Sequence, residues 1–255
     1  MAFGVLLVAG AACRFQPNHP SWIEAQGQAQ GARVGAWSGG ALTIGTDRRL
    51  WRYPGEWSRP WLPEGPQQEL RALAGSQTAI YGVLADGQVA RYQGGAWAPY
   101  AGSIGWGASE VSASEDDVLL VIVSGHVRRV DGLELRDTVC PAIGAAAIAS
   151  VGPERAFVLD GEGALFDGAP GRCDRVDAPV RLVRIAANGR RLVAVGADGT
   201  VWRRRDGAWA ALPPIEKYRP ARAPFEPRAR DVAVSVNSTW LMDDEGAIFV
   251  LSDES

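Results

Sequence analysis

The 255-residue sequence has little of several residue types on which common functions depend. It contains one lysine, and its 26 basic residues are balanced by 29 acidic ones, for a net charge of −3. Nucleic acids and acidic membrane surfaces attract concentrated positive charge, so we expect neither as a partner. His19 and His126 lie far apart, and the three cysteines form no CxxC pair and no cluster with histidine. The sequence therefore predicts no metal site and no cofactor.

Long hydrophobic runs are also lacking, apart from the apolar residues 1–12, MAFGVLLVAGAA, which Cys13 follows directly. A transmembrane helix needs about 20 apolar residues, so this run is too short to cross a membrane. It is similar to a bacterial lipoprotein signal, and this resemblance implies lipidation of Cys13 and removal of the preceding residues. We therefore expect an envelope lipoprotein whose only contact with the membrane is a lipid anchor. The alternatives are another export signal, which gives a secreted or periplasmic protein, and a short buried strand with a free thiol.

Two cysteines remain once Cys13 is set aside. Cys140 and Cys173 form an even pair, and in an oxidising compartment such a pair is a plausible disulfide. We therefore predict a Cys140–Cys173 disulfide.

Glycine and proline together number 47, which is too many for a helical bundle. Several of the glycines belong to an internal repeat. An acidic or small polar residue, usually followed by glycine, recurs in similar surroundings at intervals of 39, 38, 38, 36 and 47 residues. These six anchors are Asp47, Asp86, Ser124, Glu162, Asp198 and Glu245.

The residues around the six anchors follow one pattern. Three positions after them stand only aliphatic residues: Leu50, Val89, Val127, Leu165, Val201 and Ile248. Three before them stand Ile44, Val83, Val121, Leu159, Val195 and Met242, and five before them Leu42, Tyr81, Leu119, Phe157, Val193 and Trp240. An apolar residue in every one of these positions identifies a repeat protein.

Each unit is predicted to contain four short strands, as in ELRALAG, TAIYGVLA, QVARYQ and AWAPY of the second unit. Asp86-Gly87 predicts a two-residue primed turn between the second and third strands. Small residues dominate the first strand, which suits strands crowded around a central axis. Bulky residues mark the fourth strand: Trp97, Leu135, Cys173 and Trp209, with Trp57 one position early. We therefore predict an all-β fold, a six-bladed β-propeller of four-stranded blades, over residues 14–255.

The ring requires one more strand than the last unit supplies. The fourth-strand residue of that unit would stand at position 256, just beyond the last residue. Trp22 precedes Val34 by 12 residues, the same step as from Cys173 to Ile185. The segment around Trp22 is therefore predicted to close the ring as the N-terminal strand of the last blade.

ELRALAGSQTAIYGVLADGQVARYQGGAWAPY and RLVRIAANGRRLVAVGADGTVWRRRDGAWAALP resemble tectonin repeats, the six-bladed propellers of tachylectin-type lectins. They also resemble the related repeats of the regulator-of-chromosome-condensation family. The similarity covers residues about 30–255, and Tyr81-Gly82-Val83 occupies the aromatic-Gly-Val position of the tectonin family. The resemblance implies a propeller fold and binding of carbohydrate.

The repeated polar residues are interpreted as structural. The Asp and Glu anchors suit turns better than metal binding or catalysis. Arg52, Arg91, Arg129 and Arg203 recur five positions after an anchor. Side chains repeated in successive blades favour contacts between blades or stacking on aromatic rings over an anion-binding ring.

Candidate ligand-binding residues are those outside the repeat. Trp37, Trp61 and Trp106 belong to no repeated position and could stack against a sugar ring. The 47-residue interval contains an insertion, residues 213–230, rich in proline and arginine, which predicts a long loop on the face of the Asp-Gly turns. Its candidate contact residues are Tyr218, Arg219, Arg222 and Phe225.

No phosphate-binding glycine loop, nucleophile elbow or histidine–acid pair is visible, so we expect no enzyme. The predicted function is a monomeric, non-catalytic, extracytoplasmic module that binds cell-surface or envelope glycans. The alternative is a scaffold that holds another envelope protein through the face with the Arg/Pro-rich insertion. An enzyme whose site the sequence does not reveal stays open as a third reading.

Overall fold

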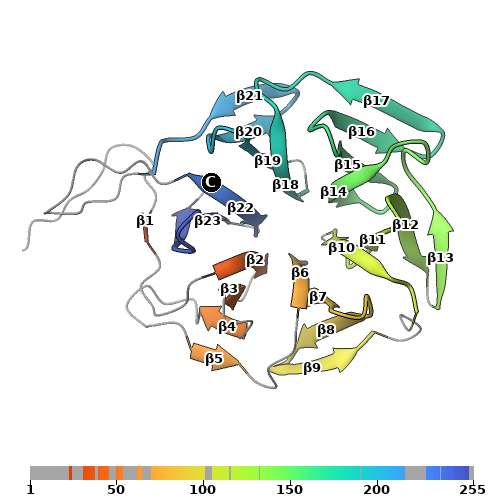
Figure 1. Ribbon diagram of the computed structural model, residues 1–255, viewed down its shortest axis with the longest axis horizontal. Helices are drawn as coiled ribbons and strands as arrows, with labels where there is room; N and C mark the ends of the chain where they lie inside the picture. Colours follow the sequence, from red (N-terminus) through yellow and green to blue (C-terminus); the bar gives the residue numbers. More distant parts are fainter. Residues whose placement is uncertain are drawn as a thin grey trace, which may run out of the picture.

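The computed structural model describes residues 23–24, 31–37, 40–45, 50–53, 62–64, 70–100, 105–114, 116–131, 133–189, 191–215, 228–235 and 237–252. These residues form 24 strands in six four-stranded antiparallel sheets. Figure 1 shows the sheets arranged as blades around a central axis, with the first strand of each blade nearest the axis. The predicted six-bladed propeller is therefore confirmed.

The blades follow one another along the chain. Blade 1 contains β2 (Gly31–Trp37), β3 (Gly40–Gly45), β4 (Leu50–Tyr53) and β5 (Leu62–Glu64), and blade 2 contains β6 (Leu70–Gly75), β7 (Ile80–Leu84), β8 (Val89–Gln93) and β9 (Ala96–Pro99). Blade 3 contains β10 (Ala108–Ala113), β11 (Leu119–Val123), β12 (His126–Asp131) and β13 (Glu134–Asp137), and blade 4 contains β14 (Ala145–Gly152), β15 (Arg155–Asp160), β16 (Leu165–Ala169) and β17 (Arg172–Val176). Blade 5 contains β18 (Leu182–Asn188), β19 (Arg191–Gly196), β20 (Val201–Arg205) and β21 (Ala208–Ala211). Blade 6 contains β22 (Ala229–Val234), β23 (Ser238–Asp243) and β24 (Ile248–Ser252), and β1 (Ile23–Glu24) completes it.

The repeated apolar residues form the core, which lies between neighbouring blades. In blade 2, Val83 and Val89 pair directly across the β7–β8 hairpin, and both are buried. They pack with Val111 and Val121 of blade 3. Each of the six blade junctions holds a cluster of this kind, so every blade depends on both neighbours for the burial of its faces.

The turn predicted at Asp86-Gly87 has a different length. The Leu84 N–H donates to the Gln88 carbonyl at 2.8 Å and the Gly87 N–H donates to the Leu84 carbonyl at 2.9 Å, which leaves a three-residue loop. In such a loop only the last residue needs a positive φ, and Gly87 supplies it at +80°. The prediction of a two-residue primed turn at Asp86-Gly87 is therefore wrong.

The two-residue turn occurs in blade 3 instead. Ser124 and Gly125, with φ of 50° and 79°, join the paired residues Val123 and His126. The shorter loop shifts the register by one residue, so Ile122 rather than Val121 pairs with Val127.

Every first strand carries a bulge after its first residue, where the register to the second strand shifts. At four junctions the N–H of that first residue donates to the carbonyl of the turn glycine in the preceding blade. The pairs are Ala108 to Gly87 at 3.1 Å, Ala145 to Gly125 at 2.8 Å, Leu182 to Gly163 at 3.4 Å and Ala229 to Gly199 at 3.3 Å. The bulge therefore releases one backbone donor per blade to link that blade to its neighbour.

The ring closes as predicted. Ile23 pairs with Val250 and Glu24 with Phe249, so β1 is the outermost strand of blade 6. Trp22 itself lies outside the described residues. In blade 1 the fourth strand is β5, later in the chain than the expected position around Trp57, which also lies outside the described residues. The reason is the eight-residue connection between β4 and β5, where blade 2 has a two-residue turn between β8 and β9.

The predicted disulfide is confirmed. Cys140 and Cys173 are bonded, with their Cα atoms 5.0 Å apart, and the bond joins the segment after β13 to β17. Closing a loop of 33 residues in the unfolded chain stabilises the fold by about 3–4 kcal/mol in the chain-entropy model. A disulfide of this kind persists in oxidising compartments and indicates an extracytoplasmic location. Among the described residues, no helix is long and apolar enough to span a membrane.

Removal of β1 should weaken the ring. A variant that lacks residues 14–30 loses the β1–β24 pairing and exposes the outer edge of β24, where Phe249 and Val250 are buried. We expect its free energy of unfolding to fall by about 2–4 kcal/mol, from lost hydrogen bonds and lost apolar burial. Urea unfolding measures the change, and a variant that lacks only residues 14–20 is the control. Equal stability of the longer deletion and the full chain would contradict this closure.

Candidate functional site

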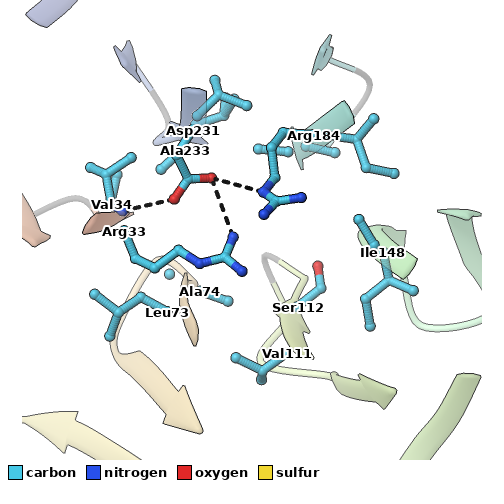
Figure 2. Close-up of a pocket in the computed structure, with 18 of the residues that line it drawn as sticks. Arg33, Val34, Leu73, Ala74, Val111, Ser112, Ile148, Arg184, Asp231 and Ala233 are labelled. Atoms are coloured by element: carbon cyan, nitrogen blue, oxygen red, sulfur yellow. Dashed lines mark hydrogen bonds and ion pairs between the residues drawn. The ribbon is translucent and has the colours of Figure 1, made fainter. Parts of the chain in front are cut away.

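The six first strands surround a cavity of about 60 Å³ at the propeller axis (Figure 2). Small residues line much of it, among them Ala74, Ala113 and Ala187, as expected for strands that converge on an axis. The backbones come close enough that a Cβ on Gly75 would lie 1.3 Å from the carbonyl oxygen of Ala36. The first strands of blades 1 and 2 could not approach in this way with a side chain at position 75.

Four charged residues interrupt this small-residue lining: Arg33, Glu110, Arg184 and Asp231, here called the axial quartet. Each is the third residue of its first strand, directly after the bulge. Blades 2 and 4 have Ala72 and Ala147 at the same register position. Because the first strands begin beside the turn glycines, the quartet lies toward the face that carries those turns.

The contacts within the axial quartet are long. Arg33 Nη2 lies 3.7 Å from Glu110 Oε2, Arg33 Nη1 lies 3.8 Å from Asp231 Oδ1, and Arg184 Nε lies 3.9 Å from Asp231 Oδ1. Direct charge-assisted hydrogen bonds are about 2.7–2.9 Å. The Val34 N–H donates to Asp231 Oδ2 at 3.1 Å, which links blades 1 and 6.

One guanidinium group of the axial quartet, that of Arg184, keeps an unused donor within the described part of the chain. Arg184 Nη1 donates to the Val183 carbonyl at 2.8 Å, whereas its buried Nε has no hydrogen-bond partner among the described residues. Figure 2 shows both guanidinium groups extending into the axial cavity. The cavity therefore offers hydrogen-bond donors to a small ligand.

Burial shifts the pKa values of three side chains of the axial quartet. Desolvation raises the pKa of Asp231 and of Glu110 above their ordinary values, and the positive charge of Arg33 only partly opposes it. Desolvation lowers the pKa of Arg184, and the neighbouring Arg33 adds to the effect. The two carboxyl groups therefore take up protons more readily than exposed ones.

A second cavity, here called the blade 5–6 groove, opens beside the axis. It has a volume of about 450 Å³, and its charged lining residues are Arg184, Arg228, Arg230 and Asp244. The Asp244 N–H donates to the Arg228 carbonyl at 2.9 Å within blade 6, and the Ala229 N–H donates to the Gly199 carbonyl of blade 5 at 3.3 Å. Arg228 and Arg230 are exposed, so this groove presents positive charge to solvent.

The described tryptophans outside the repeat are packed into the core. Trp37 is half-buried and contacts Tyr92 edge-on, with the ring centroids 6.3 Å apart, between blades 1 and 2. Trp106 is half-buried between blades 2 and 3. Trp61 lies outside the described residues. Trp37 and Trp106 therefore lie at different blade junctions and do not come together as a site.

The candidate residues of the insertion, Tyr218, Arg219, Arg222 and Phe225, lie outside the described residues, and so does Cys13. The insertion ends earlier than predicted, because Ala229 and Arg230 already belong to β22. At its other end Ile215 is buried in the core between blades 5 and 6.

The repeated arginines contact the neighbouring blade or lie over an aromatic ring, as their recurrence predicts. Arg52 Nη1 donates to the Tyr92 hydroxyl at 3.4 Å, and Arg129 Nη1 donates to the Pro153 carbonyl at 3.2 Å, each in the next blade. Arg91 lies over the ring of Tyr81, 5.8 Å from its centroid.

Sequence analysis missed the axial quartet, although a signal was present. Arg33, Glu110, Arg184 and Asp231 each stand 14 residues before an anchor, where the second unit has Ala72. This repeat position belongs to a first strand that is otherwise rich in small residues. Charge at such a position marks a point where the first strands converge on the axis. Within the described part of the chain, no group of three His, Cys, Asp or Glu side chains could hold a metal ion.

Comparison with known proteins supports the fold. No protein-family model matches the sequence, and a comparison with curated proteins gives no significant match, so the resemblance to tectonin repeats stays a prediction. Among solved structures, the chain is similar to a gluconolactonase from Xanthomonas campestris, with 12% identity, a TM-score of 0.63, and coverage of 91% of this chain and 89% of that one.

Two further similar structures are of YCF48. The protein from Cyanidioschyzon merolae has 9% identity and a TM-score of 0.59, with coverage of 91% of this chain and 98% of that one. YCF48 bound to a D1 peptide has 13% identity and a TM-score of 0.53, with coverage of 92% and 84%. These similarities show that the chain shares its propeller fold with proteins of different function.

The axial carboxyl groups should give a specific pH dependence of stability. Their folded-state pKa values lie above the unfolded values, so the stability that they contribute at low pH is lost as the pH rises through the folded values. Glu110→Gln and Asp231→Asn do not titrate at these positions. The free energy of unfolding of each variant, relative to the natural protein, should therefore rise between pH 4 and pH 7.

Asp167→Asn is the control for this measurement. The hydrogen bond from Arg155 lowers the pKa of Asp167, so its contribution to stability is present at neutral pH and lost on acidification. The relative stability of this variant should fall as the pH rises. Urea unfolding at both pH values tests the two signs, and a flat difference for both axial variants would contradict the raised pKa values.

Proposed function

We propose that the chain is a non-catalytic, extracytoplasmic binding module whose partner is a segment of another protein. The observation that carries this proposal is the blade 5–6 groove, with its exposed Arg228 and Arg230 on a rigid propeller face. Binding residues often lie on the connections of a rigid scaffold, where the groove is. A partner with acidic side chains complements its positive charge.

The packing of the tryptophans favours a protein segment over a glycan. The prediction of glycan binding, which the tectonin resemblance implies, needs exposed aromatic rings on which sugars stack. Trp37 and Trp106 instead fill the clusters between blades. The groove offers backbone and guanidinium groups, which suit an extended acidic peptide.

The comparison with YCF48 gives support at the level of the fold. The structure of YCF48 bound to a D1 peptide is an example of a similar propeller with a bound peptide. At 13% identity it supports the capacity of the scaffold and says nothing of the partner of this chain.

A pull-down from envelope extract, run beside a glycan array, tests the proposed function. We expect the protein to capture a partner, and Arg228→Glu/Arg230→Glu to reduce the amount at least about tenfold, because opposite charge repels an acidic segment. The control is Arg136→Glu, a side chain 64% exposed on the outer strand of blade 3. Equal loss in the control, or glycan binding that survives in the groove variant, would contradict the proposal.

The proposed location includes a lipid anchor on Cys13. The apolar residues 1–12 before Cys13 support it, as does the disulfide, which fits an exported protein. Metabolic labelling with a palmitate analogue should label the full chain expressed in a bacterium and leave Cys13→Ser unlabelled. Label retained in Cys13→Ser, or absent from both proteins, would show that this cysteine is not the anchor.

A further inference from the structure

We propose that the axial cavity binds one small carboxylate between Arg33 and Arg184, and that a proton is taken up from solvent onto Glu110 when it binds. This site is distinct from the proposed peptide groove, since neither Arg33 nor Glu110 lines that groove. Arg184 borders both cavities, so the variants used below leave it unchanged.

The donors of the axial quartet suit an anion. The contacts of Arg33 with Glu110 and Asp231, at 3.7 and 3.8 Å, are about 1 Å longer than direct hydrogen bonds between such groups. Arg184 Nε is buried and has no hydrogen-bond partner in the described part of the chain. A guanidinium group binds carboxylates through two parallel N–H donors, a geometry that the present contacts leave unused.

The size of the cavity limits the ligand. About 60 Å³ is several times the roughly 10–15 Å³ that one water molecule requires, and well below the roughly 150 Å³ of a cavity that holds benzene. A carboxylate group with a short stem therefore fits, and an aromatic acid does not.

The charges that face the cavity explain why a proton is taken up when a carboxylate binds. Arg33 faces it from β2, Glu110 from β10, Arg184 from β18 and Asp231 from β22, while the equivalent positions of β6 and β14 are alanines. Arg230 of β22 adds positive charge next to Arg184. With both carboxylates ionised the quartet is neutral, so a bound carboxylate would leave a buried negative charge.

Protonation of one acidic side chain removes that excess charge. Glu110 contacts one arginine and accepts the Val111 N–H at 3.3 Å, whereas Asp231 contacts two arginines and accepts the Val34 N–H at 3.1 Å. These contacts stabilise the ionised form of Asp231, so the proton goes to a carboxylate oxygen of Glu110. Burial already raises the pKa of Glu110, which reduces the free energy needed for this step.

Titration of the full chain with acetate tests the site. The Nε–H resonances of Arg33 and Arg184 are followed by NMR at constant ionic strength, with chloride as the competing anion. We expect saturable shifts of both resonances, with binding at least tenfold tighter at pH 5.5 than at pH 7.5, because one proton is taken up for each acetate bound. Absence of a saturable shift at both pH values would overturn the proposal.

Two variants separate binding from a structural role. Arg33→Gln should weaken acetate binding at least tenfold, while Glu110→Gln should bind at pH 7.5 at least as tightly as the natural protein does at pH 5.5, with no pH dependence. The gain expected in Glu110→Gln keeps the test valid if Arg33→Gln does not fold. Unchanged binding in a folded Arg33→Gln, or pH dependence that persists in Glu110→Gln, would overturn the proposal.

A competition measurement identifies the source of the carboxylate, and a groove variant separates this site from the groove. A tripeptide with a free C-terminus and its amidated form with an internal aspartate compete with acetate. Displacement by the first assigns a chain-terminal carboxylate, displacement by the second a side-chain carboxylate, and displacement by neither a free small acid. Arg228→Glu should leave acetate binding unchanged, because Arg228 lines only the groove, and loss of binding there would place the acetate in the groove and overturn the axial site.

Discussion

The convergence of six first strands on one axis is the constraint on which the rest of the structure depends. Backbones that approach as closely as those at Gly75 and Ala36 admit only small side chains nearby. The strands also bulge at their first residue, which frees an N–H to bond the turn glycine of the preceding blade. The core, by contrast, lies between the blades and is built from the repeated aliphatic residues. Close approach of the first strands at the centre and apolar packing at the junctions together hold the six blades in one ring.

Much of the fold could be predicted because the propeller is encoded locally. Val83 and Val89 flank one turn of the chain, and their pairing needs only the hairpin between them. The closing strand could be predicted as well, because the last unit lacks one strand that the segment before β2 supplies. Loop length could not be predicted, since Asp86-Gly87 fits both a two-residue and a three-residue turn.

The candidate site was less predictable, because its residues meet only in the closed ring. Arg33 and Asp231 are nearly 200 positions apart, and only their shared position 14 residues before an anchor relates them in the sequence. Trp37 lies outside the repeat, and it packs against the cluster between blades 1 and 2. Where a side chain points depends on the neighbouring blade, which local sequence patterns do not describe.

The disulfide and the closing strand β1 differ in how well they resist mechanical force. Blades 3 and 4 are joined covalently by the disulfide, whereas among the described residues two pairs between β1 and β24 complete blade 6. A tension applied to the chain ahead of Ile23 reaches the ring at β1, on the outer edge of the sheet (Figure 1). The load falls on this short strand before any other blade, so β1 is the part that detaches first under force. The remaining strands of blade 6 and the other five blades stay in place, with the disulfide holding the ring at blades 3 and 4.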